Sequence, residues 1–215
     1  MAKRIGVLIV EDDPVWRMML TRFINFEPDL HVLQAVATKE EAIAYCTRNT
    51  VDLVLMNINM SGRNLDGIEA ILELNLMGID AKIIALSSYN HEQIILDAFT
   101  AGAMHYVSKT EYRKIPEFIR LIYHSSKNSP QEVLLKEFRR LKEEKLYNQL
   151  TDAEKEIVML YEKGHNRAEI LRRLGKSEST VKNQINSILR KFNANSMKEV
   201  IRVIKNRGLH RKELD

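Results

Sequence analysis

The stretch VDLVLMNINM, residues 51–60, decides how the rest of the chain is interpreted. It is an apolar run that ends at Asn57-Ile58-Asn59, with a Ser-Gly pair just beyond it. An apolar run with a polar end is typical of a buried parallel strand, whose last side chains lie at the carboxyl edge of the sheet. Open α/β sheets carry their sites at this edge. The stretch therefore predicts a site that contains Asn57.

Four further apolar runs alternate with helical patterns along residues 1–125. Strands that alternate with helices of about ten residues indicate βαβ units, which build a parallel sheet covered by helices on both faces. We therefore predict an α/β fold with a doubly wound, five-stranded parallel sheet. The expected strands are Ile5–Val10, Leu30–Val36, Val51–Met56, Lys82–Leu86 and Met104–Val107, and the expected helices begin at Pro14, Lys39, Gly67, His91 and Ile115.

The formal charge of +4 is divided unevenly along the chain. Residues 1–125 contain 12 Lys and Arg against 16 Asp and Glu, a charge of −4, whereas residues 126–215 contain 21 against 13, a charge of +8. A basic second half suggests that this half binds a polyanion, and an ordinary solvated surface is the alternative.

Composition also excludes several classes of protein. Cys46 is the only cysteine, so neither an internal disulfide nor a cysteine-based zinc site can form. No stretch approaches the roughly 18 apolar residues that a membrane span requires, and the first apolar run is too short for a secretion signal. We therefore expect no membrane partner and a cytoplasmic location.

Side chains of different chemistry converge at the carboxyl edge of the predicted sheet, because parallel strands end there together. The strand ends deliver Glu11 and Asp12, Asn57 and the carbonyl group of Asn59, Ser87, and Lys109. Oxygen ligands of this kind hold a Mg²⁺ ion that keeps several waters, and a hydroxyl and an amine can engage a phosphoryl group. Taken singly, each residue also has an ordinary explanation, as a helix cap or a surface ion pair.

Residues 1–125 resemble the receiver domain of two-component response regulators, which has a flavodoxin-like sheet. The resemblance implies a Mg²⁺ site, phosphorylation at position 57 by a sensor histidine kinase, and a switch that moves a hydroxyl and an aromatic residue. The matching residues are Glu11 and Asp12 as the acidic pair, Asn57 at the phosphoacceptor position, Asn59 as a carbonyl ligand, Ser87 and Tyr106 as the switch pair, and Lys109 as the lysine.

The sequence departs from the family at Asn57, where the family has an aspartate that attacks phosphorus and binds the metal. An amide has lost the charge and most of the nucleophilicity, so we expect no acyl phosphate here. Removing a charge about 4 Å from another costs roughly 4 kcal/mol at an effective dielectric near 20, so Mg²⁺ binding should weaken. Asp13 is a badly placed substitute. The otherwise intact site favours replacement of an aspartate, and a naturally asparagine-bearing receiver is the alternative.

A second departure lies between Met60 and Gly67, where the turn is about two residues longer than the common pattern of the family. Beyond the receiver, residues 126–149 are interpreted as a helical linker: a polar break, then a charged amphipathic helix over Gln131–Asn148. This helix could pair with a second copy, hold the two domains apart, or rest on one of them.

Residues 150–215 have the pattern of a small all-α helix-turn-helix domain. Capping boxes at Thr151–Glu154 and Asn166–Glu169 open two short helices, and a third helix runs from Ser177 to about Phe192. Amides and cations on its polar face suit the major groove of DNA, although a solvated face is the alternative. The candidate DNA-binding residues are Ser179, Thr180, Lys182, Asn183, Asn186, Arg190 and Lys191, with Thr180, Arg190 and Lys191 better placed for phosphates.

This second region resembles the DNA-binding domain of the LuxR/NarL/FixJ type. The resemblance is carried by the pair Leu150-Thr151, by Glu154, Gly164 and Ile170, and by the run Ser179-Thr180-Val181-Lys182. It implies a fourth helix, here Ser196–Asn206, that dimerises. Val200 and Val203 are its candidate contacts, and packing within the domain is their alternative role.

Together the two regions predict a transcriptional response regulator, not an enzyme, that binds double-stranded DNA as a homodimer on half-sites about one helical turn apart. One alternative is a pseudo-receiver regulator, controlled by a protein or a ligand instead of phosphorylation. A phosphatase using Glu11 and Asp12 is disfavoured because the third strand offers no carboxylate and no Gly-rich phosphate loop occurs. An adaptor that binds only proteins is the remaining alternative.

Overall fold

The computed structural model of the chain describes residues 3–60, 66–126, 129–192 and 194–206, with only the backbone described at 143, 146 and 202–206. The chain divides into two compact units, residues 1–136 and 137–215. The division falls within the long helix α6, Pro130–Asn148, which covers the helical part of the predicted linker. The predicted domain limits at 125/126 and 149/150 remain predictions.

The first unit is built on a five-stranded parallel sheet in the order β2-β1-β3-β4-β5. This order places a topological switch point between β1 and β3, because the chain leaves β1 for β2 on one side and enters β3 on the other. The strands are β1 Ile5–Val10, β2 Leu30–Val36, β3 Leu53–Asn57, β4 Lys82–Ser87 and β5 His105–Ser108. The predicted doubly wound sheet is confirmed.

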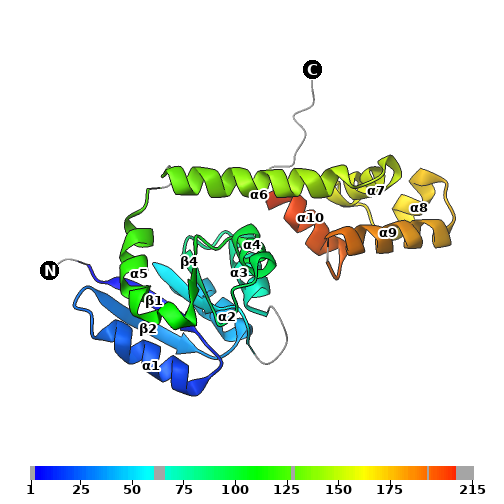
Figure 1. Cartoon of the computed structure of the whole chain (residues 1–215). Coiled ribbons are helices and arrows are strands. Elements are labelled where there is room, and N and C mark those ends of the chain that lie inside the picture. Colours follow the sequence, from blue (N-terminus) through cyan, green and yellow to red (C-terminus); the bar gives the residue numbers. More distant parts are fainter. Residues whose placement is uncertain (1–2, 61–65, 127–128, 193, 207–215) are drawn as a thin grey trace. The chain divides into compact units, whose positions relative to one another are not determined.

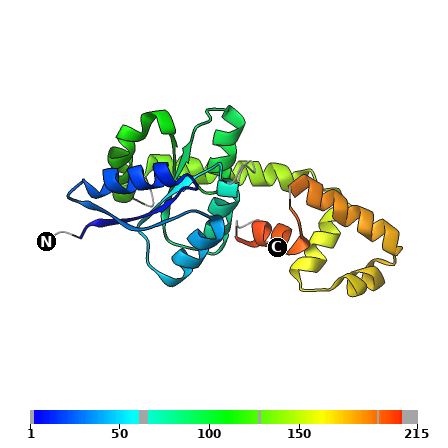
Figure 2. The same ribbon diagram turned by 90° about the horizontal axis from the view of Figure 1, so that it is seen from below.

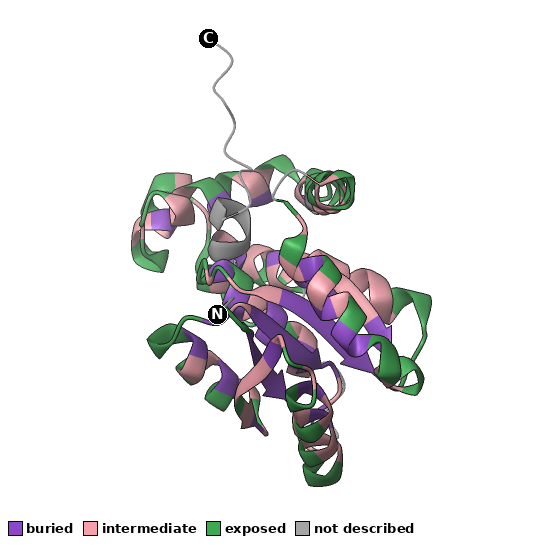
Figure 3. Cartoon of the chain, turned by 90° about the vertical axis from the view of Figure 1, so that its left-hand side faces the viewer, coloured by how far each residue is buried: buried purple, intermediate pink, exposed green. Residues whose placement is uncertain are grey.

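Helices cover both faces of this sheet (Figure 1). Successive strand residues face opposite sides, so Val54 and Met56 pack in one core cluster and Leu53 and Leu55 in another. Because both faces are covered, the central strands β1 and β3 are buried along their whole length. Figure 3 shows strands of the sheet as a buried layer beneath exposed outer helix faces. Helices α1 (Pro14–Asn25) and α5 (Ile115–His124) line one cluster, and α2 (Lys39–Arg48), α3 (Asp66–Leu76) and α4 (Glu92–Ala101) line the other.

The strand that ends at the site begins two residues later and ends one residue later than the sequence predicts. Asn57 is the last residue of β3 and pairs with Leu86 of β4, so the ladder fixes its backbone. Directly after it, the Gly67 N–H at the start of α3 donates to the Ile58 carbonyl at 2.9 Å. The longer turn predicted over residues 61–66 lies almost wholly outside the described residues.

The second unit is a bundle of short helices around its own core (Figure 2, yellow to red). Both predicted capping boxes form, with Thr151 and Asn166 as the N-caps. Gly175 takes a left-handed conformation with φ of 59°, which ends α8 and lets the chain turn into α9. The helices are α7 Asp152–Glu162, α8 Arg167–Leu174, α9 Glu178–Phe192 and α10 Met197–Asn206.

We predict that Gly67→Ala destabilises the first unit. A Cβ atom there would lie 2.0 Å from the carbonyl oxygen of Asn57 and 2.5 Å from the Cα atom of Ile58, and backbone cannot move aside cheaply. The free energy of unfolding should fall by about 1–3 kcal/mol or more, measured by urea denaturation.

Gly78→Ala is the matched control, because nothing lies within 4 Å of its Cβ position and only its φ of +70° opposes the substitution. That left-handed conformation costs roughly 1–2 kcal/mol. A Gly67 variant that is more stable than the Gly78 variant would contradict the close approach of α3 to the site.

Candidate functional site

The structure brings the predicted acidic residues together at the carboxyl edge of the sheet, at the switch point between β1 and β3. Glu11 directly follows β1 and is fully buried, and Asn57 at the end of β3 is 2% exposed. Asp12 and Asn59 lie within hydrogen-bond distance of the Asn57 side chain. The topology explains this convergence, because β1 and β3 are neighbours in the sheet although 46 residues separate Glu11 from Asn57.

The Asn57 amide lies at the centre of this cluster. Its Nδ2 atom donates to Glu11 Oε1 at 3.0 Å, to Asp12 Oδ1 at 3.0 Å and to the Asn59 carbonyl oxygen at 3.1 Å. Its Oδ1 atom accepts from the Asn59 N–H at 3.2 Å. Three acceptors on one side and a donor on the other fix which end of the amide faces the acids.

Lys109 completes the cluster from the far side. Its ammonium lies 2.7 Å from Glu11 Oε2, and both side chains are withdrawn from solvent. Burial raises the pKa of Glu11, and the hydrogen bond and charge of Lys109 oppose that rise. Lys109 also lies 5.2 Å from the centre of the Trp16 ring, a contact that the sequence did not reveal.

Ser87 and Tyr106, the predicted switch pair, both form hydrogen bonds with the backbone of Tyr89. The Ser87 hydroxyl is buried at the end of β4 and accepts from the Tyr89 N–H at 3.0 Å. The Tyr106 hydroxyl donates to the Tyr89 carbonyl oxygen, and burial raises the pKa of Tyr106. The two side chains are thus connected through the backbone of the β4–α4 loop.

Two residues, Asp13 before α1 and Arg17 within it, have structural roles. Asp13 caps α1 by accepting from the N–H groups of Val15 at 2.7 Å and Trp16 at 3.1 Å, so it is engaged away from position 57. Arg17 donates to the carbonyl oxygens of Glu11 at 2.6 Å and Asp12 at 3.0 Å and holds the acidic turn in place. The role of Arg17 could have been predicted from the sequence, because it is an arginine in the first turn of a helix that follows an acidic pair.

The arrangement does not suit a divalent cation as it stands. Mg²⁺ needs oxygen ligands directed at it, whereas Asn57 directs an N–H₂ group at the three oxygens that would serve. Within the described part of the chain, no three His, Cys, Asp or Glu side chains are grouped as a metal site.

In the second unit, α9 presents the polar face that the sequence predicts for DNA. Glu178 at its start is exposed and lies 3.3 Å from Arg167 of α8, so the single carboxylate near this face is paired. The apolar side of the helix, with Val181 and Ile188, lies in the core. Six of the candidate residues are exposed: Ser179, Thr180, Lys182, Asn183, Asn186 and Arg190.

Lys191 differs from the other candidate DNA-binding residues because it has partners within the domain. Its ammonium donates to Glu154 Oε2 at 2.6 Å and to the Gln149 carbonyl oxygen at 2.8 Å, so it ties α9 to the start of α7. Glu154 is 4% exposed and needs a partner. Burial opposes its ionisation, but hydrogen bonds from Lys191 and Thr151 hold the pKa of Glu154 at about 2. Lys191 therefore has a structural role within the domain, and its predicted contact with a phosphate stays a prediction.

Val200 is a correction to the predicted dimer contacts. Its side chain is fully buried in the core of the second unit beside Ile157 and Ile188, so it packs within the domain and is not a dimer contact. The side chain of Val203 lies outside the described residues.

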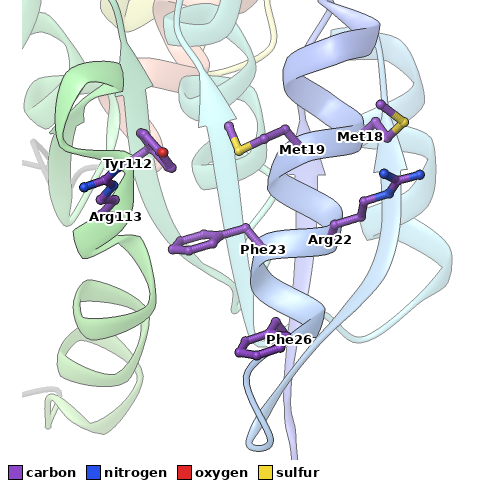
Figure 4. Close-up of a pocket in the computed structure, with 7 residues that line it drawn as sticks. All are labelled: Met18, Met19, Arg22, Phe23, Phe26, Tyr112 and Arg113. Atoms are coloured by element: carbon purple, nitrogen blue, oxygen red, sulfur yellow. The ribbon is translucent and has the colours of Figure 1, made fainter.

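An apolar groove beside η1, the 3-10 helix Lys109–Lys114, was not predicted (Figure 4). It encloses about 760 Å³. Phe26 is 88% exposed at its end, an unusual position for a large apolar side chain. The lining residues are Met18, Met19, Phe23 and Phe26 with Tyr112, and two cations, Arg22 and Arg113.

Comparisons with known proteins match both units. Residues 7–120 match the response regulator receiver domain, and residues 148–204 match the bacterial regulatory proteins of the luxR family. The response regulator protein VraR of Staphylococcus aureus is 30% identical over 190 residues, covering 87% of this chain and 90% of VraR. None of the described helices is long and apolar enough to cross a membrane.

Solved structures of response regulators also match this chain. A two-component response regulator of the LuxR family from Aurantimonas has a TM-score of 0.54 at 26% identity, covering 65% of this chain and 99% of that one. Salmonella typhimurium RcsB, at 17% identity and a TM-score of 0.52, covers 95% of this chain and 99% of its own, and shows the shared fold.

We predict that Glu154→Gln lowers the free energy of unfolding at neutral pH. The variant should also lose the part of the pH dependence of stability that comes from the Glu154 carboxyl group. The folded-state pKa of about 2 lies below the ordinary value of 4.5, so the ion pair stabilises fully above pH 4.5 and is lost as pH falls towards 2. At pH 7 the variant should lose about 1–3 kcal/mol, measured by thermal unfolding from pH 7 to pH 2.

Glu156→Gln is the control, because Glu156 is exposed on the same helix. It should change the free energy of unfolding by no more than about 0.5 kcal/mol. Equal effects of the two variants would show that the Glu154–Lys191 contact adds no stability.

Proposed function

The chain belongs to the LuxR family of two-component response regulators, and from this we propose that it is a transcription regulator whose receiver cannot be phosphorylated at Asn57. The family joins a receiver domain to a helix-turn-helix output that binds DNA and is not an enzyme. The observation that carries the proposal is the neutral amide at the centre of an otherwise complete receiver site.

For DNA binding, we propose that α9 enters the major groove. Asn183 and Asn186 are exposed on one face and can each pair with adenine through two hydrogen bonds, while Lys182 can reach guanine or phosphate. Arg190 and Thr180 would contact phosphates, which set position without reading sequence. Binding as a homodimer would place two such helices about one turn of the DNA helix apart. A regulator that binds the genome would act in the cytoplasm.

At the receiver, the chemistry of Asn57 opposes phosphorylation. Its nitrogen lone pair is delocalised and its N–H groups are donated to Glu11 and Asp12, so Asn57 itself offers no nucleophile. The amide also lacks the charge that would help hold Mg²⁺, so we propose that metal binding is weak. Glu11 and Asp12 alone would then supply the negative charge.

A sensor histidine kinase is the partner that the family implies. Because Asn57 blocks phosphoryl transfer, a second candidate is control by a bound protein or ligand without phosphorylation. The groove of Figure 4 favours it, because exposed apolar residues such as Phe26 beside Arg22 and Arg113 offer a contact surface that needs no phosphoryl group.

We predict that acetyl phosphate with Mg²⁺ modifies Asn57→Asp but not the chain with Asn57. The carboxylate restores the nucleophile and a metal ligand, whereas the amide offers neither. Intact-mass spectrometry would detect one added phosphoryl group on the variant only. Modification of both chains to the same extent would refute the proposed chemistry.

We predict that Asn186→Ala relaxes sequence specificity and that Arg190→Ala weakens binding to all sequences. With a duplex selected from a random library, the first should cost about 1–3 kcal/mol of discrimination at one base pair. The second should reduce the slope of log affinity against log salt by about one. Both can be measured by fluorescence anisotropy.

Lys163→Ala is the control for these variants, because Lys163 is an exposed cation at the end of α7, away from α9 in the sequence. Its loss should leave the salt slope unchanged. Salt-independent binding, or no duplex binding at all, would favour the adaptor alternative over a DNA-binding regulator.

A further inference from the structure

The Asn57 side chain does more than lack the charge of an aspartate, because its nitrogen lies where three oxygen groups converge. Three oxygen groups converge on it: the carboxylates of Glu11 and Asp12 and the carbonyl of Asn59, at 3.0, 3.0 and 3.1 Å. These are the groups that the receiver family would use to bind Mg²⁺. A neutral N–H₂ group therefore lies where those ligands converge, and its two hydrogens serve three acceptors.

The amide is also held in this orientation. The Asn59 N–H donates to Asn57 Oδ1 at 3.2 Å, and Asn57 is 2% exposed. Rotating the amide by 180° would break this contact and turn Oδ1 towards two carboxylates, with no donor in between. Since buried polar groups keep their partners, the observed orientation is strongly preferred.

Lys109 already places a positive charge beside Oε2, the second carboxylate oxygen of Glu11. Its ammonium lies 2.7 Å from Oε2, while Oε1 accepts from Asn57. One oxygen of the fully buried carboxylate thus accepts a hydrogen bond from Asn57, and the other forms an ion pair with Lys109. The protein itself supplies the donors that a metal-binding receiver would leave to Mg²⁺ and its waters.

We propose that the Asn57 amide takes the place of the divalent cation, so that this receiver is built to be stable without metal and Mg²⁺ can enter only if the amide leaves. The inference rests on the proposed function in identifying this edge as a receiver site, and it goes beyond that function by assigning Asn57 a positive role. The side chain of Asn57 then binds the acidic residues through hydrogen bonds in place of a metal ion. The receiver is thereby held in one metal-free state.

The variant Asn57→Ala separates this inference from the loss of charge alone. If Mg²⁺ binds weakly only because position 57 lacks a charged ligand, then alanine, which has no ligand atom, should bind no better than asparagine. If instead the amide occupies the cation position, then alanine vacates it and should bind Mg²⁺ more tightly. The two explanations predict opposite orders of affinity.

The experiment is a Mg²⁺ titration of the full chain and of the variants Asn57→Ala, Asn57→Asp and Asn148→Ala, starting from EDTA-treated protein. Trp16 is the only tryptophan, and the nearby Lys109 contacts Glu11, so Trp16 fluorescence reports on the site. Asn148 is exposed at the end of α6 and controls for the loss of an amide elsewhere. Melting temperature with and without Mg²⁺ is the second readout.

We expect Asn57→Ala to bind Mg²⁺ at least about tenfold more tightly than the original chain, because no hydrogen bonds to an amide must be broken first. Without metal, Asn57→Asp should melt roughly 5–10 °C lower than the original chain, because three carboxyl groups then face one another, and Mg²⁺ should restore it. The original chain and Asn148→Ala should be insensitive to Mg²⁺ in both readouts.

Affinity of Asn57→Ala equal to or below that of the original chain would overturn the inference and leave the proposed function standing. Phosphorylation of the original chain would instead refute the proposed function. If Asn57→Ala does not fold, nuclear magnetic resonance of the original chain decides. The side-chain N–H₂ protons of Asn57 should exchange slowly and be unmoved by millimolar Mg²⁺, and a shift on adding Mg²⁺ would overturn the inference.

Discussion

A carboxylate buried at the edge of an apolar sheet must be paired, and this constraint on Glu11 organises the first unit. Lys109 satisfies one oxygen and Asn57 the other, so residues from the ends of β1, β3 and β5 are held at one point. Arg17 fixes the backbone of the same turn, and Gly67 lets α3 approach the strand end closely. The sheet order makes the pairing possible, because β1 and β3 are neighbours and β5 brings its lysine back to the same edge. The receiver site is therefore also a structural junction of the domain.

The second unit meets the same constraint in a different fold. Glu154 is buried at the start of α7, and Lys191 reaches it from the far end of α9. The pair holds the end of α9 against the start of α7, and the exposed face of α9 takes no part in this contact. The basic charge of this half thus has two parts: cations that build the domain and cations that stand ready for a polyanion. A charge count cannot separate the two, because both raise the net charge equally.

The two units differ in what an asparagine at position 57 means for them. The DNA binding proposed for α9 relies on the amides and cations of that helix and not on chemistry at Asn57. The receiver, in contrast, has lost the group whose modification would change its charge. Its switch residues, Ser87 and Tyr106, remain connected through Tyr89 and could still respond to a partner that moves this loop. The groove lined by Phe23 and Phe26 offers such a partner apolar surface on the same unit.

Local pattern alone determined the alternation of strands and helices, both capping boxes and the strand ends that carry Glu11, Asn57 and Lys109, because each depends on residues close together in the sequence. The alternation also implied the parallel sheet, because a helix between successive strands brings the chain back to run in the same direction. What the pattern could not decide was the partner of each polar atom. That Lys191 is bound by Glu154, that Val200 is internal, and that the Asn57 nitrogen faces three oxygens are facts of packing. They depend on distances between residues 37 to 46 positions apart, or on which side of a helix meets a core, and only the folded chain sets these.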